Sequence, residues 1–263
     1  MATTYLRPLT FDEVLDGAFS LYRRNFRAFF ITALVPLLPM AALWAVAAIV
    51  LPSGAAGASA GGMLRTVGTI YGAFANILVY AALTREAANA CEGESVSWQA
   101  GLKTGLRRYP SVLVGAFLAA LAMTVGMLFF IVPGVLIGIM FFAVVPVTVL
   151  EGKGPFAALA RSKRLAKGAW GRIFGVVFVL YLIVMIPAIA TAGAGGAAMG
   201  FSAMAGTSAW GTGMYLLQIA NVLLSALTAP LLMAGVVLLY FDRRVRSEGL
   251  DLEREVEQLA PSV

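Results

Sequence analysis

Two rows of polar side chains lie within otherwise apolar stretches of this chain and have the spacing of a binding site. In the segment 66–84, Asn76 and Tyr80 share one helical face with Thr69. In the segment 214–241, four polar residues follow one another at intervals of three or four: Gln218, Asn221, Ser225 and Thr228. Such intervals place side chains on one face of an α-helix, so the two rows are candidates for lining a polar pocket. The alternative is that they only join neighbouring helices by hydrogen bonds, each contributing about 1 kcal/mol or less.

A cluster of basic residues is the second candidate site. It lies between two long apolar stretches and consists of Arg161, Lys163, Arg164 and Lys167. Anionic lipid attracts such residues by about 1 kcal/mol each when they lie near a bilayer surface. Because the apolar stretches hold the cluster close to a membrane, we expect membrane phospholipids as partners and no nucleic acid.

The residues that most often carry catalysis are scarce. The chain contains no histidine, and its one cysteine is Cys91. It therefore has no counterpart of the commonest general base and metal ligand, and zinc and iron–sulfur sites are not expected. The string 57–61 has the spelling of a nucleophile elbow, and 193–198 has that of a dinucleotide fingerprint, but neither follows a predicted strand. The sequence predicts no catalytic residue, no metal and no cofactor.

The elements that would position these residues are transmembrane helices. Hydrophobic residues make up 60% of the chain and charged residues 12%, and the mean hydropathy is +0.89, whereas about one quarter of a soluble domain is charged. Four long stretches contain no Asp, Glu, Lys or Arg: 28–64, 66–84, 109–150 and 173–241. One crossing takes about 20 apolar residues, so the first two stretches hold one span each and the last two hold a pair each. The predicted spans are 28–51, 66–84, 111–131, 134–150, 172–192 and 214–241.

Two features of the connections follow from this assignment. The turn signal Val132–Gly134 predicts a tight hairpin between the third and fourth spans, and the glycine- and alanine-rich segment 193–213 is predicted to join the last two. Apart from Arg172, the first residue of the fifth predicted span, no side chain except tyrosine is ionisable within the predicted spans. This argues against ion-coupled transport and proton relays, which usually keep a charged group at depth, but not against a passive path.

The basic residues predict the orientation. All but one of the 19 lysines and arginines fall on the same side of a six-span chain, and the exception is Arg65. Short loops rich in lysine and arginine stay in the cytoplasm. We therefore predict a multi-pass protein of the inner (plasma) membrane, one domain over 1–263, with both termini cytoplasmic and a cytoplasmic tail over 242–263.

Three amphipathic segments precede pairs of spans. The first, over 10–27, begins with a capping box formed by Thr10 and Glu13 and is predicted to lie along the membrane surface with its aromatic side chains in the lipid. The second begins near Ser97, and the third runs from Phe156 to Trp170. One interpretation is a threefold repeat of surface helix, span and span; the alternative is that any basic loop beside a membrane looks amphipathic. The predicted fold class is an all-α membrane bundle of six spans and three interfacial helices.

Three stretches together resemble a known family. They are RPLTFDEVLDGAFSLYRRNF over 7–26, AALARSKRLAKG over 157–168 with Trp170, and LYFDRRVRSEGLDL over 239–252. They are similar to the membrane-domain family of glycerophosphoryl diester phosphodiesterase, which includes many stand-alone membrane proteins. In longer members the domain precedes a phosphodiesterase barrel that uses histidines and a divalent metal, and this sequence has no such residues. The resemblance implies a membrane module of anchoring or regulatory type, with no catalytic residue to carry over.

The functional hypothesis is a non-enzymatic integral membrane protein that acts as a scaffold or regulator or engages lipid headgroups. The alternative is a carrier or channel for a lipid-like or neutral small solute, which would use the polar rows of the second and sixth spans. A protein partner or a homo-oligomer is compatible with either, and the sequence does not identify one.

Overall fold

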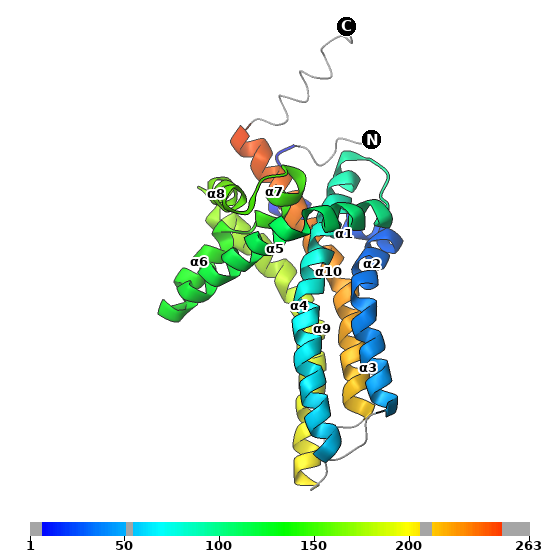
Figure 1. Ribbon diagram of the computed structural model, residues 1–263. Helices are drawn as coiled ribbons and strands as arrows, with labels where there is room; N and C mark the ends of the chain where they lie inside the picture. Colours follow the sequence, from blue (N-terminus) through cyan, green and yellow to red (C-terminus); the bar gives the residue numbers. More distant parts are fainter. Residues whose placement is uncertain (1–6, 51–54, 206–211, 249–263) are drawn as a thin grey trace.

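The chain folds into an all-α bundle, as predicted (Figure 1). The computed structural model describes residues 7–50, 55–205 and 212–248. Residue 51 of the predicted first span, 206–211 of the predicted connection and 249–263 of the predicted tail lie outside the described residues. Within the described part, six helical stretches are long and apolar enough to cross a membrane: Phe26–Val50, Gly61–Glu92, Trp98–Phe129, Ile131–Leu150, Trp170–Met204 and Gly213–Glu248.

The first amphipathic segment forms α1 (Phe11–Arg24), and it starts with the predicted capping box. The side chain of Thr10 accepts a hydrogen bond from the Glu13 amide, and the Glu13 carboxylate accepts one from the Thr10 amide at 2.7 Å. The apolar face of α1 packs mainly on α10 (Thr212–Glu248), and the Tyr22 hydroxyl donates to the Leu227 carbonyl at 2.8 Å. This apolar face therefore covers protein, although the edge residue Phe19 remains exposed.

The first span is interrupted near its middle. It consists of α2 (Phe26–Leu34), a short 3₁₀ turn η1 (Val35–Leu37) and α3 (Leu38–Val50). Pro36 lies in the turn and Pro39 follows it. Because proline has no N–H and its ring crowds the preceding turn, a break at this place is expected.

The second and third spans are longer than predicted. The helix α4 (Ala55–Glu92) continues beyond 84, and α5 (Trp98–Phe129) joins the second amphipathic segment and the third span into one helix that contains Pro110. The second interfacial helix is therefore not a separate element. Tight packing of α3 on α4 depends on Gly68, because a Cβ atom there would lie 2.7 Å from the ring of Trp44.

The fourth span is divided into two short helices, α6 (Ile131–Met140) and α7 (Val144–Leu150). The hairpin turn lies at Phe130, whose backbone is extended, two residues before the predicted turn. In Figure 1, α5 and α6 leave the bundle obliquely, and their turn ends well short of the far ends of α4 and α9 (Trp170–Met204).

The last span pair is preceded by the third amphipathic segment, which forms α8 (Pro155–Ala166). The prediction for 193–213 was wrong in its first part, since α9 continues as a helix through the glycines and alanines to Met204. A helix satisfies its backbone hydrogen bonds internally, which favours continuation of even a glycine-rich segment in apolar surroundings. The three predicted units thus differ: α1 and α8 are separate helices, whereas the middle amphipathic segment is part of α5.

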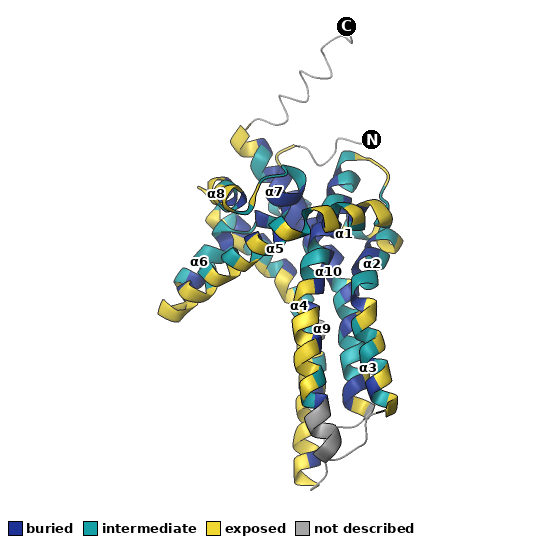
Figure 2. Ribbon diagram, viewed as in Figure 1, coloured by how far each residue is buried: buried dark blue, intermediate teal, exposed yellow. Residues whose placement is uncertain are grey.

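The helix α10 is the centre of the bundle, with α9, α3, α1, α4 and α2 packed around it. Its second half is almost fully buried from Leu231 to Asp242. Figure 2 shows that burial is concentrated where α1, α7 and this half of α10 meet, whereas the lower parts of α4 and α9 expose apolar side chains. We call the buried end, which carries Glu151, Arg161 and Asp242, the basic end, and the opposite end, near Arg65, the far end.

Candidate functional site

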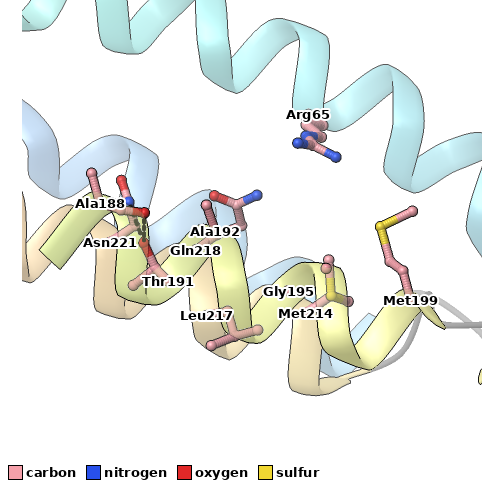
Figure 3. Close-up of a pocket in the computed structure, with 11 residues that line it drawn as sticks. Arg65, Ala188, Thr191, Ala192, Gly195, Met199, Met214, Leu217, Gln218 and Asn221 are labelled. Carbon is pink, nitrogen blue, oxygen red and sulfur yellow. Dashed lines mark hydrogen bonds between the residues drawn. The ribbon is translucent and has the colours of Figure 1, made fainter. Parts of the chain in front are cut away.

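A polar cavity lies between α4, α9 and α10 in the half of the bundle toward the far end (Figure 3). Its volume is about 330 Å³. The residues that line it come from all three helices: Arg65, Ala188, Thr191, Ala192, Gly195, Gly196, Met199, Met214, Leu217, Gln218 and Asn221. The predicted polar residues Gln218 and Asn221 therefore face one space.

A second cavity of about 210 Å³ adjoins the first, since Ala188 and Asn221 line both. It is bounded by the remaining predicted polar residues, Asn76 and Tyr80 from α4 and Ser225 and Thr228 from α10, together with Val184, Met185, Leu224 and Ala229. We call the two adjoining cavities the polar cleft. All six residues predicted for an intramembrane polar face line it.

The hydrogen bonds show that packing and pocket are both present. The Asn221 side chain donates to Thr191 Oγ1 at 3.0 Å and so connects α10 to α9 (Figure 3). The Asn76 side chain donates to the Gly72 carbonyl at 2.8 Å, and Thr228 donates to the Leu224 carbonyl at 2.9 Å. Both of these bonds stay within one helix, which satisfies a donor at each residue without filling the cleft.

The cleft exists because α4 and α9 each pack on α10 and scarcely touch each other. The wall that α9 contributes includes the small residues Ala188, Gly195 and Gly196, which leave room for the first cavity. Exposed apolar residues of α4 (Ile70, Phe74) and of α9 (Ile189) lie on the outer surfaces of these helices. The two helices are therefore separated from each other beside the polar cleft.

Arg65 is the cation of the cleft. It is the one basic residue predicted on the far side, and Figure 3 shows its side chain on α4, on the opposite side of the cavity from α9 and Gln218. It forms no ion pair with another residue in the described ranges. A positive charge at the rim, with amide and hydroxyl groups deeper in the cleft, is a combination suited to binding a polar or anionic group of a ligand.

The basic end holds a second polar assembly, and Arg161 is part of it. Arg161 Nε donates to both carboxylate oxygens of Glu151 at 3.1 Å, and its Nη2 donates to Glu248 Oε2 at 2.6 Å. Tyr240 donates to Glu151 Oε1 at 2.9 Å. Hydrogen bonding to Glu248 raises the pKa of Arg161, although burial opposes this. Burial tends to raise the pKa of Glu151, but hydrogen bonds from Lys153, Arg161 and Tyr240 outweigh it and lower that pKa.

The predicted lipid-binding cluster is therefore divided. Arg161 was predicted to contact headgroups, and its guanidinium is instead engaged by two carboxylates of the protein. Lys163, Arg164 and Lys167 remain exposed on and just after α8. The helix turns Arg161 inward because its buried side also carries Ala158, Ser162 and Leu165.

Two buried carboxylates were missed by the sequence analysis. Asp242 is fully buried, and its Oδ1 accepts hydrogen bonds from the Leu9 amide and from Arg246 Nε, both at 2.9 Å. Arg172 Nε lies 3.3 Å from its Oδ2, close enough for an ion pair although the N–H is not aligned for a hydrogen bond. The side chains of Arg172 and Arg246 also donate to the Leu9 carbonyl. Asp242 thus fastens the start of the described chain to α9 and α10.

Glu86 is the second buried carboxylate, and 1% of it is exposed. Thr32 of α2 donates to its Oε1, and its Oε2 has no hydrogen-bond partner among the described residues. The missing side chain of Gly101 on α5 makes room for the carboxyl group. The predicted spans ended before Glu86 and Asp242, whereas the helices α4 and α10 continue through both carboxylates.

The fold and the cleft together define a class: an α-helical bundle suited to several membrane crossings, with a polar cleft between its helices. Within the described ranges no group of three or more histidine, cysteine, aspartate or glutamate side chains is arranged to hold a metal ion. Comparisons with protein-family models, with curated proteins and with solved structures gave no match. The resemblance to the phosphodiesterase membrane-domain family stays a prediction.

Proposed function

We propose that this chain is a non-enzymatic membrane carrier that takes the polar headgroup of an amphiphile into the polar cleft between α4, α9 and α10. The observation that carries the proposal is that two adjoining cavities, of about 330 and 210 Å³, collect all six polar residues of the second and sixth spans. Side chains that served only to join helices would leave no such space beside Asn76 and Asn221.

The position of the cleft favours a lipid-like ligand over a small soluble one. Since α4 and α9 are separated along the cleft, an amphiphile can enter from the bilayer with its acyl chains still in hydrocarbon. Arg65 supplies a positive charge at the far-end rim, so a phospholipid with net negative charge, such as phosphatidylglycerol, is the favoured class. The absence of histidine from the sequence supports transport or binding without bond cleavage.

The test is lipid translocation in proteoliposomes. Fluorescent phosphatidylglycerol in the inner leaflet is protected from dithionite until the protein moves it outward. Ala188→Phe places a ring where the two cavities meet, and it is expected to lower translocation to the rate of protein-free vesicles. Ala190→Phe is the matched control, because Ala190 is exposed on α9 and lines neither cavity.

Arg65→Gln should reduce the preference for phosphatidylglycerol over phosphatidylcholine and leave the protein folded. Wild-type protein that moves neither lipid faster than protein-free vesicles would refute the carrier proposal. Equal effects of the substitutions at Ala188 and Ala190 would also contradict the assignment of the cleft as the route.

A second candidate function is the binding of anionic headgroups by α8, and the continued exposure of Lys163, Arg164 and Lys167 supports it. Reversing these three charges to glutamate should reduce the anionic lipid retained by the detergent-solubilised protein, measured by native mass spectrometry. Reversal of Lys103 and Arg107, exposed on α5, is the control. Equal retention by both variants would end this proposal. Arg161 is left unchanged because its reversal would break the ion pairs with Glu151 and Glu248.

A further inference from the structure

The α5–α6 hairpin is too short on one side to cross a bilayer. The returning helix α6 has 10 residues, which at 1.5 Å per residue extend about 15 Å, whereas the hydrocarbon core is about 30 Å thick. The chain then turns at 141–143 before α7 begins. This limb of the hairpin therefore covers about half of the distance that a crossing needs.

The C-terminal end of α6 is held beside α8 by hydrogen bonds. The Ser162 hydroxyl of α8 donates to the Met140 carbonyl at 2.9 Å and accepts a hydrogen bond from the Ala143 amide at 3.1 Å. Since α8 carries exposed Lys163 and Arg164 at the basic end, the break between α6 and α7 lies beside a surface helix. The second limb of the hairpin therefore ends beside α8.

The first limb of the hairpin, formed by α5, is also limited in the depth it can reach. At Gly115 of α5, a Cβ atom would lie 3.1 Å from Val144 of α7 and 3.9 Å from Pro155, the first residue of α8. Residue 115 is thus still at the basic end, and from there to Phe129 the helix extends about 21 Å along its own axis. The hairpin is also oblique to the bundle (Figure 1), which reduces its depth further.

The tip of the hairpin is apolar and is not covered by protein. Five consecutive residues, Leu128–Val132, are between 67% and 80% exposed. Two of them, Ile131 and Val132, line a wholly apolar groove of about 420 Å³ together with Trp170, Gly171 and Phe174 from the first turns of α9. The tip and the first turns of α9 therefore border one apolar groove that runs along α6. An exposed apolar surface of this size marks a site of contact with lipid or with another protein.

The two limbs form one rigid unit. A Cβ atom at Gly126 would lie 3.0 Å from the Gly134 Cα atom, so the helices are in backbone contact near the tip. The Phe130 amide donates to the Gly126 carbonyl at 3.2 Å, and the Gly134 amide donates to the Phe130 carbonyl at 3.4 Å. Pro133 has no N–H, so the turn exposes fewer unsatisfied backbone groups to lipid, where each is costly.

We infer that α5 and α6 form a re-entrant hairpin that enters only the leaflet at the basic end, and that its apolar surface binds the acyl chains of that leaflet. The grooves between the hairpin and α9 are the contact surface. One is the groove at the tip, and the other, of about 340 Å³, is lined largely by apolar residues that include Met123, Ile139, Phe174 and Phe178. The bundle then crosses the membrane four times, by α2–α3, α4, α9 and α10. This inference does not depend on the function of the polar cleft.

The distribution of charge is the same for both topologies. A hairpin that begins and ends on one side places the same loops on that side whether it crosses twice or not at all. The positive-inside rule therefore fixes only the parity of the crossings, and the lengths and contacts of the limbs decide between four and six.

The test is the accessibility of single cysteines in sealed vesicles, in a Cys91→Ala background. Val132→Cys reports on the tip, Lys163→Cys on the basic end and Ala205→Cys on the far end of α9. An impermeant maleimide should label K163C and A205C from opposite sides. It should label V132C from neither side, although V132C reacts after solubilisation in SDS. A bimane attached at V132C should be quenched by lipids with a spin label on the acyl chain and not by iodide.

Labelling of V132C from the side that labels A205C would mean that the hairpin crosses the bilayer, and it would overturn the inference. Labelling from the side that labels K163C would place the tip in water and would overturn it as well. A bimane that neither acyl-chain spin labels nor iodide quenches would place the tip against protein, which also contradicts lipid contact.

Discussion

Asp242 is the residue whose replacement should most clearly separate the N-terminal segment from the bundle. Its buried carboxylate accepts the Leu9 amide at 2.9 Å and pairs with Arg172 and Arg246. A hydrogen bond to a charged group contributes about 1.5–3 kcal/mol, and the Leu9 bond is buried, so its loss counts in full. The two arginine side chains are 25% and 37% exposed, and solvent screening reduces their contribution to about 1 kcal/mol together.

Asp242→Ala is therefore expected to destabilise the protein by about 3 kcal/mol. The free energy needed to detach the segment around Leu9 should fall by about 2 kcal/mol, which raises the fraction of molecules with this segment detached roughly thirty-fold. Asp242→Asn keeps an oxygen that can accept the Leu9 amide but loses the charge, so it should fall between the alanine variant and the wild type.

The assay is hydrogen–deuterium exchange of the peptide that contains Leu9, followed by mass spectrometry, with unfolding by SDS in mixed micelles as the measure of global stability. Gly171→Ala, near Arg172 but with open space around its Cβ position, is the control for a change at this end of α9. If the Leu9 amide exchanges at the same rate in Asp242→Ala as in wild type, the buried carboxylate does not hold this segment and the reasoning fails.

Two further predictions concern the basic end and the hairpin. Hydrogen bonds hold the pKa of Glu151 below its ordinary value of 4.5. The ionised carboxylate therefore stabilises the fold fully when the pH is above 4.5, and this stabilisation is lost as the pH falls through the lowered pKa of the folded state. Glu151→Gln should consequently show a smaller decrease in unfolding temperature than wild type between about pH 6 and pH 3, and identical pH profiles would contradict this. Gly134→Ala would place a methyl group 2.9 Å from the Met127 amide nitrogen and should lower stability by about 1–3 kcal/mol, measured by SDS unfolding. The control Gly171→Ala should be close to neutral, and equal losses in both variants would argue against a tightly packed hairpin.

Much of the fold could be predicted because hydrocarbon imposes a simple rule on composition. The uncharged stretches locate all six long apolar helical stretches, and the capping box of Thr10 and Glu13 locates the start of α1. The ends of the helices were less predictable. The spans were ended at the first charged residue, but α4 and α10 continue past Glu86 and Asp242, whose carboxylates are accommodated by Thr32 of α2 and by the Leu9 amide.

The candidate site could be predicted in part, for a similar reason. Spacing along a helix shows that Asn221 and Ser225 share a face, but it does not show whether a neighbour fills the space in front of them. That depends on α9, whose small residues Ala188 and Gly195 leave the cleft open. In the same way, the sequence places Arg161 and Lys163 in one cluster, and only the packing of α8 shows that Arg161 is paired with Glu151 and Glu248.

The central place of α10 has a consequence for biosynthesis. Ribosomes deliver the chain from its N-terminus, so α1 to α9 emerge before the helix on which most of them pack. Until then α4, α5, α6 and α7 can pack on one another, but the faces of α1, α3 and α9 that α10 covers remain open. The bond between the Leu9 amide and Asp242 joins residues 233 positions apart. Assembly of this bundle must therefore be a late, largely post-insertion event, and nascent chains stalled before α10 should be preferred targets for membrane proteases.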